Sequence, residues 1–226
     1  MSLLLATVLL LQDNTAEETL KKIEVVIEKA KTLSVDVQMG QLGGINGGDE
    51  APQITYAIGS ALFKEGNRAL FRMTTVPGRQ SGQWGILSDG DSMYRAFKVE
   101  ASPPKLSQVL KRSITRGGIV QTLNFSALRN LNSTLEGQIQ GMTTQIEVSD
   151  FSGIADDEEK LSKTFSYRVK VVHSNVFQNV QLWYNPKDYH LVRVRNTVGI
   201  SPETYQNFHF DEDIPDEKFK IVEKDK

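Results

Sequence analysis

Apolar and polar residues alternate along much of the chain with a period of two. Val35, Val37 and Met39 are separated by single polar residues, and a similar alternation recurs at residues 54–58 and 165–171. Because successive side chains of a strand point to opposite faces of a sheet, each segment predicts a strand with one apolar and one polar face. The chain is therefore expected to be rich in β-structure.

Short turn sequences separate these predicted strands. They lie at residues 64–67 (KEGN), 88–91 (SDGD) and 185–188 (NPKD). Gly, Asn, Asp and Pro are the residue types that turns require, and a short turn joins antiparallel neighbours, since a parallel pair needs a long crossover. The pattern predicts an antiparallel meander.

Three segments follow the helical period instead. The first begins at Thr15, a residue type that caps helices, and its apolar residues fall on one face over about four turns. The second, residues 105–116, follows a pair of prolines, and the third covers residues 125–135. We expect the first helix to lie on the sheet by its apolar face.

The chain begins with an apolar run, LLLATVLLL at residues 3–11. The run is too short to cross a bilayer as a helix, but it has the length of the apolar region of a signal peptide. We interpret residues 1–16 as a signal peptide and residues 17–226 as one domain. The alternative is a buried first strand or helical turn.

Charge and composition exclude several classes of protein. The 26 Lys and Arg residues are balanced by 28 Asp and Glu residues, so no large positive field is present to attract nucleic acid. The chain has no cysteine, which removes disulfides, cysteine-ligated metals and the acceptor of a lipid anchor.

The sequence contains none of the common catalytic motifs. No phosphate-binding loop, nucleophile elbow or zinc-protease motif occurs, and His173, His190 and His209 stand far apart. The acidic runs at residues 156–159 and 211–213 lack the spacing of a calcium loop, so we interpret them as solvated loops. No enzyme activity, cofactor or metal is predicted.

Aromatic residues occur in predicted strands in both halves of the chain, among them Trp84, Tyr94, Trp183 and Tyr205. A sheet that curls would bring many of them to its concave side, where they could line a binding groove. The alternative is an ordinary core beneath the helices, which needs no ligand.

Several segments, taken in order, resemble the LolA/LolB lipoprotein-sorting superfamily. They are AEETLKKIEVVIEKAKTLSVDVQM, GSALFKEGNRALFRM, ILSDGDSMYRAF, VQLWYNPKDYHLVRVR and TYQNFHFDEDIPDEKF. The resemblance implies a mainly β (α+β) fold. It would be a curved antiparallel sheet forming an incomplete barrel of about eleven strands, with helices packed in its concave side. It also implies an apolar cavity that accepts lipid acyl chains.

On this basis we expect a monomeric periplasmic carrier of lipid acyl chains or lipoproteins that has no lipid anchor. The residues expected to line the groove, with a helical lid at 106–110, are Ile54, Tyr56, Ile58, Phe71, Trp84, Tyr94, Leu106, Val109, Leu110, Trp183 and Tyr205. The alternative is a regulatory module of the same fold that senses the envelope and contacts a membrane-protein partner. An enzyme is the third possibility.

Overall fold

A computed structural model describes residues 15–42, 53–76, 83–95, 98–120, 122–123, 146–157, 161–171, 177–198 and 201–221. The helical elements are α1 (Ala16–Lys29), α2 (Leu106–Ser113) and the 3-10 helix η1 (Asp216–Phe219). The strands are β1 (Thr32–Leu42), β2 (Gln53–Lys64), β3 (Arg68–Thr75), β4 (Gln83–Ser88), β5 (Ser92–Arg95), β6 (Lys98–Ala101), β7 (Ile146–Ser149), β8 (Ala155–Asp157), β9 (Ser162–Val171), β10 (Phe177–Tyr184), β11 (Leu191–Val198) and β12 (Ser201–Phe210).

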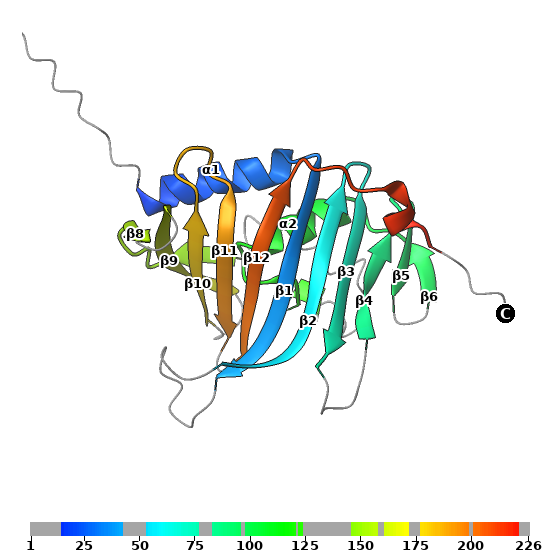
Figure 1. Cartoon of the computed structure of the whole chain (residues 1–226), viewed down its shortest axis with the longest axis horizontal. Coiled ribbons are helices and arrows are strands. Elements are labelled where there is room, and N and C mark those ends of the chain that lie inside the picture. The colour runs from blue at the N-terminus through cyan, green and yellow to red at the C-terminus, as the bar shows by residue number, and fades with distance from the viewer. Residues whose placement is uncertain are drawn as a thin grey trace, which may run out of the picture.

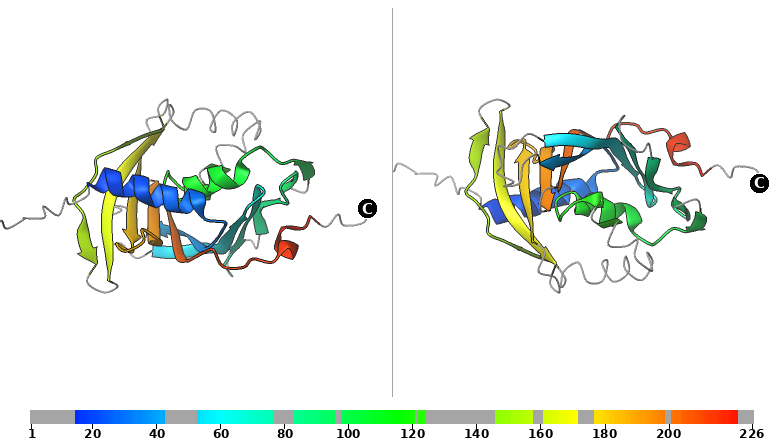
Figure 2. Two further views of the ribbon diagram at one scale, coloured as in Figure 1. Left: turned by 90° about the horizontal axis from the view of Figure 1, so that it is seen from above. Right: turned by 90° about the horizontal axis from the view of Figure 1, so that it is seen from below.

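These twelve strands of the described chain form one antiparallel sheet (Figure 1). Its order is β6-β5-β4-β3-β2-β1-β12-β11-β10-β9-β7, and β8 pairs with β9 beside β7. The first and last strands thus meet in the middle, where β1 pairs with both β2 and β12. The sheet curls around α1 and α2 without closing, as Figure 2 shows. The predicted incomplete barrel with helices on its concave side is confirmed.

Two residues at the start of α1 explain why the helix begins where it does. Thr15 and Glu18 form a capping box, in which each side chain bonds the backbone N–H of the other residue. Leu20, Ile23 and Ile27 are buried on one face, as the helical spacing predicts. The helix α2 is also confirmed, whereas the predicted helix at residues 125–135 and the predicted signal peptide, apart from residues 15 and 16, lie outside the described residues.

The side of the sheet that faces α1 and α2, here called the inner face, carries the apolar core. Alternate residues of each long strand contribute to it. Examples are Val35 and Val37 on β1, Phe71 and Met73 on β3, and Phe165, Tyr167 and Val169 on β9. The opposite side, here called the outer face, is largely polar.

A smaller apolar cluster lies on the outer face near the C-terminus. Leu70 packs there with Ile214 and Phe219, so η1 covers this part of β3. Asp216 accepts ion pairs from Lys64 at 2.6 Å and Arg68 at 2.7 Å, which fix η1 to the β2–β3 hairpin. The end of the described chain is thereby attached to its first half.

One loop prediction was wrong. Residues 156–159 were expected to form a solvated acidic loop, but Asp156 and Asp157 belong to strand β8, and residues 158 and 159 lie outside the described residues. Lys163 of β9 lies 3.6 Å from the carboxylate of Asp156, and the Ser162 hydroxyl donates to Asp157 at 3.0 Å. Partners on the neighbouring strand therefore let acidic residues pair at the sheet edge. The three predicted turns do connect antiparallel neighbours.

Candidate apolar binding site

The candidate site is the inner face together with the layer that covers it. That layer consists of α1, α2 and residues 114–120, and it forms one continuous apolar core with the sheet. Leu106, Val109 and Leu110 of α2 are buried, and α2 lies against β2 and β3. Among the described residues, therefore, α2 and the concave side of the sheet share one apolar core.

The start of α2 is fixed by a residue of the β2–β3 turn. Asn67 adopts a left-handed backbone conformation, with φ of 61°, and accepts a hydrogen bond from the backbone N–H of Ser107 at 3.0 Å. Its amide nitrogen donates to the carbonyl of Pro103 at 2.8 Å. A side chain distant in sequence thus satisfies one of the free N–H groups at the start of a helix, where Lys105 supplies no side-chain cap.

Beyond α2 the chain is joined to the inner face through buried polar groups. The Tyr167 hydroxyl donates to the carbonyl of Thr115 at 2.6 Å, and the Asn196 amide donates to the carbonyl of Ile114 at 3.0 Å. Burial, together with the charge of Glu24, raises the pKa of Tyr167 well above its usual value. The phenol therefore remains a neutral donor.

A second attachment follows at Glu203 and Tyr205 of β12. The Glu203 carboxylate accepts from the backbone N–H of Val120 at 3.0 Å and from the Tyr205 hydroxyl. The Tyr205 hydroxyl in turn accepts from the backbone N–H of Ile119 at 2.6 Å. Burial first, and then the charge of Glu203, raise the pKa of Tyr205 well above its usual value.

Two glycines lie where this segment approaches the sheet. Gly117 and Gly118 have φ of 108° and 98°, a region that residues with a Cβ rarely adopt. A Cβ at Gly118 would lie 2.3 Å from a carboxylate oxygen of Glu203, and one at Gly117 would lie 2.1 Å from the amide oxygen of Gln178. The positive φ favours glycine at both positions, and a Cβ at either one would displace the end of a side chain from β12 or β10.

Charged groups connect α1 with the chain after α2. The Arg116 guanidinium donates to the two oxygens of Glu24 at 2.6 and 2.8 Å, and both side chains are largely buried. Lys111 donates to the carbonyl of Ala30 at 3.1 Å. Burial lowers the pKa of Lys111, although nearby acidic groups partly oppose this effect.

The structure brings only some of the predicted groove residues together. Phe71, Leu106, Val109, Leu110 and Tyr205 all belong to the buried core between sheet and helices. Tyr56 packs partly buried against that core, and its hydroxyl lies 3.9 Å from the sulfur of Met39. Ile54 and Trp84 lie on β2 and β4, and their side chains are outside the described part of the structure.

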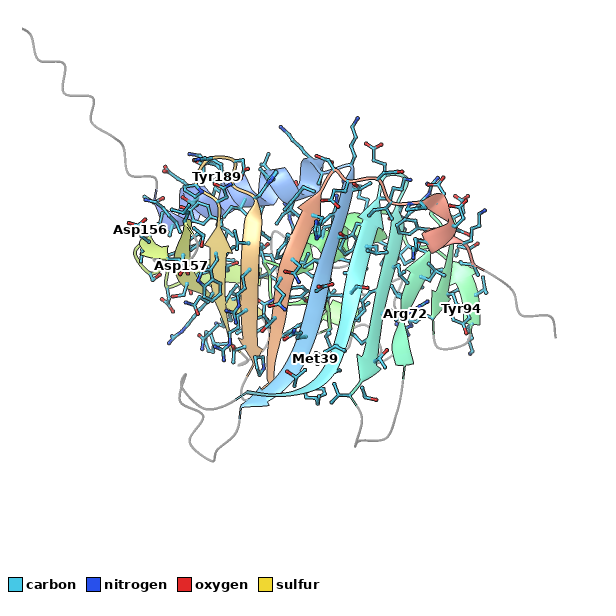
Figure 3. All side chains as sticks on the ribbon, in the orientation of Figure 1. Met39, Arg72, Tyr94, Asp156, Asp157 and Tyr189 are labelled. Atoms are coloured by element: carbon cyan, nitrogen blue, oxygen red, sulfur yellow. The ribbon has the colours of Figure 1, made fainter. Side chains whose placement is uncertain are left out.

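The remaining three residues lie on the outer face. Ile58 is 49% exposed and Tyr94 is 38% exposed, while Trp183 stacks with Arg193. Figure 3, drawn from the outer side with the helices behind the sheet, labels Tyr94 on β5. Of the alternation at residues 54–58, Ile58 lies on the outer face, because the inner positions that follow on β2 carry Ala57, Gly59 and Ala61. A Cβ at Gly59 would lie 1.9 Å from the carbonyl oxygen of Arg72.

Sequence reasoning missed the polar groups that hold the covering layer, namely Glu24, Arg116, Tyr167, Asn196 and Glu203. The adjacent glycines at 117 and 118 are the one signal that could have indicated a close backbone approach. Among the described residues no group of His, Asp and Glu side chains is arranged to hold a metal ion. None of the described helices combines the length and apolar character needed to cross a membrane.

Comparison with known proteins gives matches by structure and none by sequence. No family model matches the chain, and no curated protein matches it by sequence. Among solved structures, the chain is similar to the lipoprotein LppX of Mycobacterium tuberculosis, with 11% identity and a TM-score of 0.44 over 87% of this chain and 95% of that one. LprF of Mycobacterium bovis has 10% identity and a TM-score of 0.42 over 89% and 96%.

A LolA superfamily protein of Nitrosomonas europaea has 10% identity and a TM-score of 0.35 over 92% of this chain and 98% of its own. A member of the predicted superfamily is thus among the structures that this chain resembles. Since these TM-scores are below 0.5, we take neither ligand nor partner from the neighbours. The contacts of this chain carry the proposals that follow.

Proposed function

We propose that this protein binds the acyl chain of a lipid or lipoprotein on the inner face of its sheet, with α2 acting as a lid. The observation that carries the proposal is the way α2 is held. Phe71 and Met73 of β3 belong to the same apolar core as Leu106 and Leu110 of this helix, which has 8 residues. The hydrogen bonds that fix the region come from Asn67 at its start, from Lys111 within α2, and from side chains that bind the chain beyond Ser113.

A ligand could displace a helix that is held in this way from the sheet. A helix as short as α2 is marginal on its own in water, so it keeps its structure through packing. An acyl chain inserted beneath it would contact apolar side chains of both the sheet and the lid. Each methylene buried contributes about 0.8 kcal/mol, so a long chain could offset the cost of breaking the hydrogen bonds that hold the lid.

Export to the periplasm and a monomeric carrier state belong to the same proposal. The apolar run at residues 3–11 supports export. The absence of cysteine means that the chain offers no thiol for a lipid anchor, so a soluble carrier fits better than an anchored receptor.

The test is a titration of the delipidated protein with cis-parinaric acid, whose fluorescence rises when it enters an apolar site. We expect saturable binding that palmitate displaces and octanoate does not, because the shorter chain buries fewer methylenes. Native mass spectrometry of protein from its own envelope should show a co-purified lipid. No saturable binding together with a lipid-free mass spectrum would contradict the proposal.

A further inference from the structure

A hollow of about 680 Å³ lies on the outer face, across the sheet from the proposed acyl site. Its lining comes from β9, β10 and β11, together with Asp150 after β7. The lining residues are Asp150, Ser166, Tyr167, Arg168, Asn179, Val180, Gln181, Arg195 and Thr197. Most of them carry polar side chains, and Ser166, Gln181 and Arg195 lie opposite one another in the sheet register. An acyl chain would leave these polar groups without partners.

The positive charge of Arg195 is not balanced by an ion pair within the described residues. Arg168 lies 3.3 Å from the carboxylate of Asp150, so these two neutralise each other. Within the described parts of the chain Arg195 forms no ion pair, and its Nε is buried without a hydrogen-bond partner. The hollow therefore carries one uncompensated positive charge with a donor already removed from water.

A second arginine lies beside the hollow. Arg193 is two residues away on the same face of β11, with its guanidinium 5.0 Å above the ring of Trp183. Its Nε is also buried without a partner. Thr204, paired with Arg195 in the register, is 3% exposed, and its hydroxyl has no hydrogen-bond partner in the described structure. Three unpartnered polar atoms thus gather on one face of β11 and β12.

We propose that this hollow binds a phosphate group carried by a polar organic molecule, with Arg195 as the principal contact. A guanidinium presents donors in a planar fork that matches phosphate oxygens, and two adjacent arginines suit a group with more than one negative charge. The amides of Asn179 and Gln181 and the hydroxyl of Ser166 supply neutral partners for the rest of the molecule. The volume is in the range of sites for small organic ligands.

Two kinds of molecule could carry this phosphate group: a soluble phosphate ester, or an anionic phospholipid in its headgroup. Calorimetry with sn-glycerol 3-phosphate tests the first, and flotation with vesicles of phosphatidylglycerol, compared with phosphatidylcholine, tests the second. The variants are Arg195→Gln, which removes the charge, and Arg72→Gln, which removes an exposed arginine of the same face on β3 (Figure 3).

We expect Arg195→Gln to weaken binding of the effective probe about tenfold or more, since hydrogen bonds to charged groups are the strong ones. Arg72→Gln should change it less than about twofold. Circular dichroism and melting curves check that both variants are folded. If neither probe binds, or if the two variants weaken binding equally, the site does not exist. Because this hollow is on the outer face, cis-parinaric acid binding should be the same in both variants, whatever the outcome here.

Discussion

The carboxylate of Glu24 accepts two hydrogen bonds from the guanidinium of Arg116, at 2.6 and 2.8 Å, and so joins α1 to the chain that follows α2. The Thr115 hydroxyl adds a third bond to the same carboxylate at 3.1 Å. Burial works to lower the pKa of Arg116, but the hydrogen bonds and charge of Glu24 outweigh it and raise the pKa. This largely buried pair links the helix that is packed on the sheet to the chain that follows the proposed lid.

Glu24→Gln should destabilise the protein by about 3 kcal/mol, because it leaves a largely buried arginine without its counter-charge. Urea unfolding measures this loss. If the lid opens by breaking this link, the variant should also bind cis-parinaric acid more tightly, because less free energy is needed to open it. The control is Glu28→Gln, whose half-exposed pair with Arg112 should be worth less than about 1 kcal/mol. Equal effects of the two variants would contradict the role of Glu24.

Gly118→Ala should cost roughly 2–3 kcal/mol of stability, since it combines an unfavourable backbone conformation with a contact on the Glu203 carboxylate. Gly153→Ala is the matched control, because a Cβ at Gly153 meets nothing within 4 Å. The control should lie within about 0.5 kcal/mol of the wild type. Chemical denaturation measures both, and a Gly118→Ala protein of wild-type stability would show that residues 117–120 do not need this close approach.

Asn67→Ala should cost about 1–2 kcal/mol, because α2 then loses the group that bonds the Ser107 N–H. Asn67→Gly removes the same bonds but tolerates the positive φ, so it should recover part of the loss. Asn67→Asp keeps the acceptor and loses the donor to Pro103, and should lie between Asn67→Ala and the wild type. Thermal melts rank the three variants. A ranking set by φ alone would show that the side-chain bonds are unimportant.

Stability should fall at alkaline pH because of two buried phenols. Tyr167 and Tyr205 have pKa values raised well above 10.0 in the folded protein, mainly by burial. Above pH 10 the unfolded chain therefore releases protons that the folded chain retains, so the contribution of these groups is present below pH 10 and is lost as pH rises. Each phenol contributes up to about 1.4 kcal/mol per pH unit.

The check is urea unfolding between pH 8 and 11. Tyr167→Phe should be less stable at pH 8, since it loses the bond to Thr115, but should show a shallower decline than the wild type. This comparison removes contributions common to both proteins, such as those of lysines. A slope in Tyr167→Phe equal to that of the wild type would refute the assignment for Tyr167.

The sequence predicted the fold better than the site. Alternation and short turns determine strands and antiparallel pairing locally, and these were confirmed in β1, β9 and the three turns. The inner face of β2 could not be found in this way, because close packing there selects Ala57, Gly59 and Ala61, while Ile58 is on the outer face. On this strand Ile58, a large apolar residue, marks the outer side.

The polar attachments were not predictable for a different reason. Glu24 and Arg116 are 92 residues apart, and Tyr167 and Thr115 are 52 apart, so only the folded chain brings them together. In the sequence, Glu24 is one of several charged residues in an amphipathic helix and has no distinguishing neighbour. The outer hollow is also formed by cross-strand neighbours, which no local motif reveals.

The most direct measurement of the central claim is photocrosslinking with a diazirine-bearing palmitate, followed by mapping of the labelled residues by mass spectrometry. If the acyl chain binds on the inner face beneath α2, labels should appear around Ala61, Phe71 and Leu110, and excess unlabelled palmitate should remove them. Labels confined to Ile58 and Tyr94 on the outer face, or labelling that palmitate does not displace, would contradict it.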